Sequence, residues 1–356
     1  MIRICLPLVV LAMLTSSMAA AQDFMFSAKY NGDELEGRPL LWTDQQMLIL
    51  ARDGALHTVD PRQAEEARKT APRFQGYTTS EMRSALYDEF GRAKTVTSTG
   101  HYLVVHRPGE SDAWATRFEE LYRSFQNYFR VRGFKLHRPK YPLVAVIYDS
   151  EQEYHEAARK TGAELQPNTL GHYDPTSNRV LMFDRVGNHD RDWGITANTI
   201  VHEATHQMAF NTGLHSRTAT TPQWVVEGLA TMFEARGVYQ SGAGDTRRDR
   251  INQGRLDDYF HFVDSATGKL TLGELVASDT PFRTSSQRAY AEAWALTFFL
   301  SETRPREYEQ YLKLTAARKP LSEYEPVERV RDFQSVFGND LTMLESNFRT
   351  WMNELR

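Results

Sequence analysis

The sequence predicts an α+β protein, and three observations support this class. Short strand-like segments separated by turn residues occupy residues 22–60. A continuous apolar run at 143–148 predicts a buried strand further along the chain. From residue 196 onward, apolar residues recur mainly at helical spacing. The chain has 356 residues, of which 41% are hydrophobic and 25% charged, so it can bury a substantial core.

The overall charge excludes some partners. The chain carries 42 basic and 46 acidic residues, for a formal net charge of -4. A balance so close to zero gives no electrostatic footprint for nucleic acid, and we expect no nucleic-acid partner. No feature of the composition fixes an oligomeric state.

Residues 1–21 resemble a signal peptide. Arg3 precedes the apolar run 4–14, and residues 19–21 are three alanines that suit signal-peptidase cleavage. We expect cleavage after Ala21, a secreted or periplasmic protein, and no stable membrane insertion afterwards. The alternatives are a buried N-terminal helix or an uncleaved anchor. Because the only cysteine, Cys5, lies in this segment, the mature chain would have neither disulfides nor Cys-ligated zinc.

A small β-rich module is expected at residues 22–60. The segments 48–50 and 55–59 flank Asp53-Gly54, a dipeptide typical of a two-residue hairpin turn in which both residues have positive φ. The charged stretch 61–96 is interpreted as a linker with one helix near 80–90. Residues 97–356 then form a larger domain.

The larger domain is expected to combine a mixed or antiparallel sheet with helices. A helix should follow the N-cap candidate Ser111, because six aromatic and aliphatic side chains recur at helical spacing after it. The expected strands are 101–105, 143–148, 171–173 and 180–183. The other expected helices are 151–160, 196–211, 222–236, 290–302, 307–317 and 341–355.

The sequence His202-Glu203-Ala204-Thr205-His206 has the HExxH pattern. Positions i and i+4 share one face of a helix, so both imidazoles could hold one metal ion. Glu203 would point beside the ion, where it could act as general base toward a bound water. The alternative is that His202 and His206 are merely polar neighbours on a helix.

Glu227 is the candidate third ligand. It lies within an apolar segment of the next expected helix, where a carboxylate is costly unless it is paired or binds a metal. Gly228 and Ala230 would allow close helix packing beside it. Glu234, two turns further along the same face, is the competing ligand, and the alternative for Glu227 is an ordinary surface position.

These residues resemble a known family. HEATHQ followed by PxWxxEGLA is similar to gluzincin zinc metallopeptidases, and most to a bacterial group known only as a domain of unknown function. The resemblance is specific over 199–234, looser over 103–300 and absent from the N-terminal module. It implies a zincin-like catalytic domain and one Zn²⁺ per chain, held by His202, His206 and Glu227. It also implies Glu203 as catalytic base and a peptide or protein substrate.

Some positions depart from related patterns. Metzincins would need His at the position of Thr212 and Gly at that of Ala209. Thermolysin-like enzymes carry an Asp where this chain has Thr231, so the orienting partner of a ligand histidine is unassigned. Tyr290, at the start of the helix expected at 290–302, is the candidate for stabilising the oxyanion, with a core position as the alternative.

Other residues near the expected site have weaker signals. His172 and Tyr173 precede the HExxH helix, on a segment where gluzincins have an edge strand that pairs with an extended substrate. An ordinary strand pair is an equal alternative for them. Arg283 and Arg288 could meet a substrate carboxylate. Structural or exposed positions are expected for three isolated histidines, His189, His215 and His261.

The pattern predicts a secreted zinc-dependent hydrolase that cleaves peptide bonds. Two other classes stay open at this point. One is a non-catalytic binding or scaffold protein on a peptidase-like fold, although the intact Glu203 argues against it. The other is a zinc hydrolase of a cell-wall amide or an ester.

Overall fold

The computed structural model describes residues 24–109, 113–163, 165, 169–183, 194–240, 246–265 and 270–356. The expected signal peptide, residues 1–21, lies outside this part. The chain divides into two compact units. The first contains residues 24–52 and 57–75, and the second contains residues 53–56 and the chain from Gly76 to Arg356.

The first unit is an antiparallel five-stranded sheet with the order β4-β3-β2-β1-β5. A two-residue turn joins the first two strands, and both of its residues, Asn31 and Gly32, have positive φ. Apolar side chains of β1 and β3 form a small core of their own. The strands are β1 Met25–Tyr30, β2 Asp33–Trp42, β3 Met47–Ala51, β4 Leu56–Val59 and β5 Glu65–Ala71.

Two details of this unit differ from the expectation. Residues 65–71, expected in the linker, form β5 instead. Nearly all side chains of β5 are exposed, so this edge strand pairs through its backbone and leaves no apolar alternation in the sequence. The turn between β3 and β4 is also longer than two residues. Only Gly54 has positive φ there, and Asp53 accepts a hydrogen bond from the backbone N–H of Ala55 at 2.9 Å.

The second unit contains a mixed sheet with the order β6-β7-β8-β10-β9. Its three central strands are parallel, and β6 and β9 pair antiparallel at the two edges. The strands are β6 Thr95–Ser98, β7 Tyr102–His106, β8 Leu143–Tyr148, β9 Gly171–Asp174 and β10 Arg179–Phe183.

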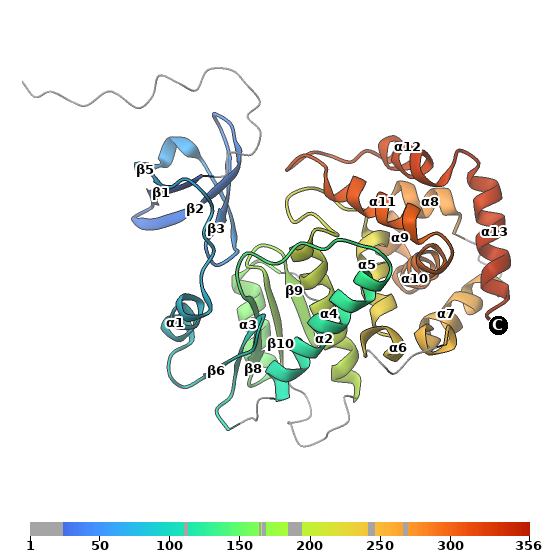
Figure 1. Ribbon diagram of the computed structural model, residues 1–356, viewed down its shortest axis with the longest axis horizontal. Coiled ribbons are helices and arrows are strands. Elements are labelled where there is room, and N and C mark those ends of the chain that lie inside the picture. Colours follow the sequence, from blue (N-terminus) through green and yellow to red (C-terminus); the bar gives the residue numbers. More distant parts are fainter. Residues whose placement is uncertain are drawn as a thin grey trace, which may run out of the picture. The chain divides into compact units, whose positions relative to one another are not determined.

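Both faces of this sheet are covered. Alternate residues of β8 enter two separate apolar cores: Leu143, Ala145 and Ile147 enter one, and Val144, Val146 and Tyr148 the other. The first core continues into α2 Ala113–Val131 and α4 Gly194–Thr212, and the second into α1 Thr79–Phe90 and α3 Glu151–Lys160 (Figure 1). Burial of both faces explains why the strand is apolar throughout.

The rest of the second unit is helical (Figure 1). No helix in the described part of the chain is both long and apolar enough to cross a membrane. The α-helices after α4 are α5 Gln223–Phe233, α6 Arg236–Tyr239, α7 Gln253–Asp264, α8 Leu272–Ala277, α9 Thr280–Thr284, α10 Ser286–Thr303, α11 Pro305–Ala316, α12 Pro326–Phe337 and α13 Leu341–Asn353, and short 3₁₀ helices occur at Pro61–Gln63 and Arg248–Arg250.

The α+β class is therefore confirmed, with an antiparallel N-terminal sheet and a helical body. The expected helices 196–211 and 222–236 correspond to α4 and α5 within a few residues. The helix expected to begin at Tyr290 begins earlier, at Ser286, so Tyr290 lies in its second turn. Ser286 and Gln287 are polar, so the apolar pattern did not include them, although they form the start of the helix.

Candidate metal centre

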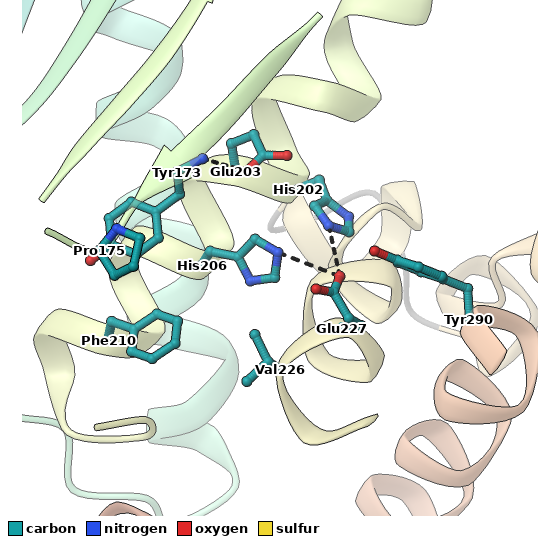
Figure 2. Close-up of a pocket in the computed structure, with 9 residues that line it drawn as sticks. All are labelled: Tyr173, Pro175, His202, Glu203, His206, Phe210, Val226, Glu227 and Tyr290. Carbon is teal, nitrogen blue, oxygen red and sulfur yellow. Dashed lines mark hydrogen bonds and ion pairs between the residues drawn. The ribbon is translucent and has the colours of Figure 1, made fainter. Parts of the chain in front are cut away.

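Helix α4 carries the HExxH motif in the second unit. Ile200, Val201 and Ala204 are fully buried and fix the rotation of the helix against the sheet. His202 and His206 consequently project together toward α5, with ring centroids 4.6 Å apart and ring planes nearly perpendicular (Figure 2). The spacing of four residues thus places two imidazoles on one face, as the motif predicts.

Helix α5 presents Glu227 to these imidazoles. Its N-cap residue is Pro222, which offers no side-chain cap. The first helical N–H, that of Gln223, instead donates to Asp279 Oδ1 at 2.9 Å. Arg329 holds that aspartate through bonds of 2.7 and 2.9 Å. A tertiary cap therefore anchors the start of the helix that carries Glu227.

The three candidate ligands converge. Glu227 Oε2 lies 3.3 Å from His202 Nε2 and 3.6 Å from His206 Nε2 (Figure 2). One potential ligand atom from each residue lies within 4.8 Å of the other two. Two imidazole nitrogens and one carboxylate oxygen form a donor set that zinc takes in catalytic sites with an open fourth position.

The environment of Glu227 supports a cation here. Its Oε2 atom is buried and accepts no hydrogen bond from the described residues, although it lies between two imidazoles. A carboxylate oxygen in such a position is costly unless a positive charge satisfies it. The residues present therefore fit a zinc ion.

Glu234 holds the far side of His202. Its Oε1 lies 2.8 Å from His202 Nδ1, and its Oε2 accepts a bond of 2.8 Å from Asn252 Nδ2. A carboxylate at this position fixes the ring and the nitrogen that carries the proton, so that Nε2 can face a metal. Glu234, the competing ligand in the sequence, is therefore placed as the orienting partner that was unassigned. The Thr231 hydroxyl, by contrast, donates to the carbonyl oxygens of Glu227 and Gly228 in its own helix.

Glu203 lies beside the ligands and faces the edge strand β9. Its Oε2 accepts a hydrogen bond from the backbone N–H of Tyr173 at 2.7 Å (Figure 2). Burial raises the pKa of Glu203, and the nearby imidazoles only partly oppose that effect. The carboxylate is thus both oriented and made more basic.

Tyr290 approaches from α10. Its hydroxyl points toward His202 and Glu227, and it lines the same pocket as they do (Figure 2). Burial, followed by the negative charge of Glu227, raises the pKa of Tyr290 far above its ordinary value. The hydroxyl therefore keeps its proton at neutral pH and can donate a hydrogen bond.

The contact between α5 and α10 sets the separation of these groups. A Cβ atom at Gly228 would lie 2.5 Å from the carbonyl oxygen of Ala293 on α10. Only glycine permits this approach, which confirms the expected close packing at this position. It brings Tyr290 on α10 up to Glu227 on α5.

Opposing contacts set the charge states of two ligands. Burial alone would lower the pKa of His202, but contacts with Glu227 and Glu234 outweigh it and raise the pKa well above the ordinary value. Burial alone would raise the pKa of Glu227, yet His206 and His202 outweigh it and lower the pKa below the ordinary range. Glu227 is therefore ionised and available as a ligand.

Other residues named from the sequence lie elsewhere. His172 is bound through Nδ1 to Tyr154 at 2.9 Å and does not line the pocket. Arg283 and Arg288 do not line it either. His215 is buried, as a structural histidine would be, and His261 is exposed, whereas His189 lies outside the described residues.

Comparisons with known proteins give a family match and weak structural similarities. Residues 196–322 match the model of a family described as protein of unknown function (DUF1570). The match covers less than half of the chain but includes all five candidate residues. A comparison with curated proteins finds no match.

Several solved structures of zinc metallopeptidases are similar at a low level. An M1 zinc metallopeptidase from Deinococcus radiodurans is 15% identical, with a TM-score of 0.36 over 72% of this chain and 50% of that chain. A mutant of it bound to a Tyr-Ser-Ala substrate is 13% identical, with a TM-score of 0.37 over 73% and 51%. The chain thus spans about half the length of these enzymes. Similarity at this level does not identify an activity.

Proposed function

We propose that this protein is a zinc metallopeptidase of the gluzincin type. The observation that carries the proposal is the convergence of His202, His206 and Glu227, whose potential ligand atoms lie within 4.8 Å of one another. The proposed setting is the bacterial periplasm or the exterior, since residues 1–21 have the pattern of a signal peptide.

Glu203 is the proposed general base. It takes a proton from the attacking water and delivers it to the nitrogen of the leaving amine. The hydrogen bond from the Tyr173 N–H holds one carboxylate oxygen, so the other is available for the proton. A zinc ion on the three ligands would supply Lewis acidity toward the water and the scissile carbonyl.

Tyr290 is the proposed oxyanion donor. Its hydroxyl faces the ligand cluster, and burial and Glu227 raise its pKa further above neutral pH, so that it is a neutral donor. A neutral hydroxyl that points to the place where negative charge develops stabilises the transition state more than the ground state.

A peptide substrate is supported by the edge strand β9. The Leu170 carbonyl accepts a backbone hydrogen bond from the Phe183 N–H, and hydrogen-bonding direction alternates along a strand. The backbone N–H and C=O groups of His172 and Asp174 therefore face β10, and those of Gly171 and Tyr173 face away from it. The Tyr173 N–H indeed points at Glu203. An extended peptide could add to this side of β9 and bring its scissile bond to the ligand cluster.

The first test is metal content. We expect about one zinc per wild-type chain by elemental analysis, clear loss in Glu227→Ala, and retention in the control Glu120→Ala, which removes an exposed carboxylate from α2. Peptide hydrolysis should follow the metal, except in Glu203→Gln, which should keep zinc and lose activity. His206→Ala should lose both. A folded wild type that takes up no supplied zinc would refute the proposal.

A further inference from the structure

One wall of the pocket beside the ligands is apolar. The pocket has a volume of about 260 Å³, and Phe210, Tyr173, Pro175 and Val226 line it together with the ligands (Figure 2). Phe210 lies one helical turn after His206 on α4, so the wall begins next to the metal position. The Phe210 and Tyr173 rings are stacked, with centroids 5.6 Å apart.

The polar groups around this wall are already occupied or uncharged. The Tyr173 hydroxyl donates to Asn178 Oδ1 at 2.8 Å, so that ring contributes its apolar face. The His215 ring packs against Phe210 at 5.2 Å, and burial lowers the pKa of His215 to about 3, so it is neutral at neutral pH. None of the described residues that line the pocket is Lys or Arg. An acidic side chain would find no partner on this wall.

The position of the wall relates it to one side of the cleaved bond. Pro175 follows the C-terminal end of β9, beyond Tyr173. Antiparallel strand pairs outnumber parallel ones, and a peptide that adds to β9 in this sense runs in the opposite direction, so the residues before its scissile bond lie toward Pro175. The apolar wall thus faces a side chain on the N-terminal side of that bond.

We propose that this pocket selects a large apolar side chain, aromatic or long aliphatic, on the N-terminal side of the cleaved peptide bond. Phe210 and Val226 are the specificity-determining residues. The inference rests on the proposed peptidase function and goes beyond it by naming the substrate class. Because one missing methylene in an apolar pocket already costs ~10- to 200-fold, Phe or Leu should be preferred to Gly at that position by at least ~100-fold in kcat/KM.

The test is a peptide library digested by the zinc-loaded wild type, with cleaved bonds identified by mass spectrometry. Phe210→Ala should lose most of the advantage of Phe over Ala before the bond, yet keep its zinc. Phe262→Ala, which removes a half-buried phenylalanine from α7 outside the pocket lining, is the matched control and should keep the preference. Pro175→Lys, at an exposed lining position, should raise cleavage after Glu relative to wild type.

Each outcome separates the two proposals. Hydrolysis with zinc bound, but without an apolar preference or with that preference after the bond, would overturn the inference and leave the peptidase proposal intact. An unchanged preference in Phe210→Ala would also overturn it. A wild type without zinc and without hydrolysis would overturn both.

Discussion

Glu227 and Glu292 are largely buried carboxylates on the packed helices α5 and α10, and they differ in the side chains that face them. The Glu227 carboxylate faces the two imidazoles of His202 and His206. The Glu292 carboxylate faces Arg349, whose Nη1 lies 2.5 Å from Glu292 Oε2. The side chain of Glu227 is 13% exposed and that of Glu292 is 2% exposed, so burial does not single out the candidate ligand.

The partners of the two carboxylates indicate which of them is suited to bind a metal. Arginine is permanently charged, so Glu292 has a cation within the protein, although its Oε1 accepts no hydrogen bond from the described residues. Arg349 also bonds to Glu345, Tyr259 and the Leu270 carbonyl, which joins α13 to α7 and α10. An imidazole can release its proton and bind a metal through the freed nitrogen, which a guanidinium cannot do. The Glu227 cluster is therefore the one suited to an added cation.

Exchanging the two carboxylates for alanine should give opposite results, and these are the largest effects we expect. Glu227→Ala should lower zinc affinity by more than ~100-fold, the upper range for loss of a mere orienting partner. Glu292→Ala should keep zinc but lower the free energy of unfolding by up to about 3 to 5 kcal/mol, since Arg349 stays buried and loses the nearer of its acidic partners, Glu292 and Glu345. Metal titration and urea unfolding of the two metal-free variants measure both quantities.

The contrast between the two carboxylates would be wrong if either substitution produced the effect expected of the other. A large loss of zinc affinity in Glu292→Ala, at a temperature where the variant is still folded, would mean that the two clusters act as one. So would a loss of unfolding free energy in metal-free Glu227→Ala as large as that of Glu292→Ala.

The next largest effect is expected from the contact between α5 and α10, at the residues that follow the two glutamates. Gly228 follows Glu227 and meets the carbonyl oxygen of Ala293, which follows Glu292. Gly228→Ala should lower the free energy of unfolding by about 1 to 3 kcal/mol by overpacking, and should lower kcat as Tyr290 moves away from the ligands. Thermal unfolding and peptide hydrolysis measure these changes.

Gly273→Ala is the matched control for this exchange. Gly273 lies in α8, where an added Cβ would meet nothing within 4 Å. The control should be neutral or slightly stabilising because alanine has the higher helix propensity. Equal effects of the two exchanges would show that the α5–α10 contact is not tight.

The ligand cluster was predictable because local rules determine most of it. The HExxH spacing places His202 and His206 on one helical face, and the apolar surroundings of Glu227 mark it as an unusual carboxylate. The role of Glu234 was not predictable. Whether it reaches Nε2 or Nδ1 of His202 depends on how α5 crosses α4, which is a tertiary property.

The sequence also did not predict one long-range contact and one edge strand. Asn252 lies far from Glu234 along the chain and belongs to no motif, so nothing local connects it to His202. Strand β5 has exposed, charged side chains and pairs only through its backbone. In both cases the information lies in the packing and not in a periodic pattern.

Glu234 is intermediate between the two carboxylates, since it has a protein partner and yet serves a ligand. Glu234→Gln keeps the shape but removes the charge that orients His202. Zinc affinity should fall ~10- to 100-fold, the usual range for such partners, while the fold persists. Competition with a chelator measures the affinity. A loss as complete as in Glu227→Ala would make Glu234 a ligand and reverse their assignment.

Asn252→Ser should have the smallest effect, and it acts on zinc only through Glu234. Asn252 caps α7 by accepting the Arg255 N–H and also donates to Glu234 Oε2. Serine keeps the cap but is too short to reach Glu234, so zinc affinity should fall by only a few-fold, roughly the value of one hydrogen bond of about 1 kcal/mol. Thr271→Ser, at the N-cap of α8, is the control and should leave zinc affinity unchanged. If Asn252→Ser weakened zinc binding as much as Glu234→Gln does, the amide rather than the carboxylate charge would hold His202 in place.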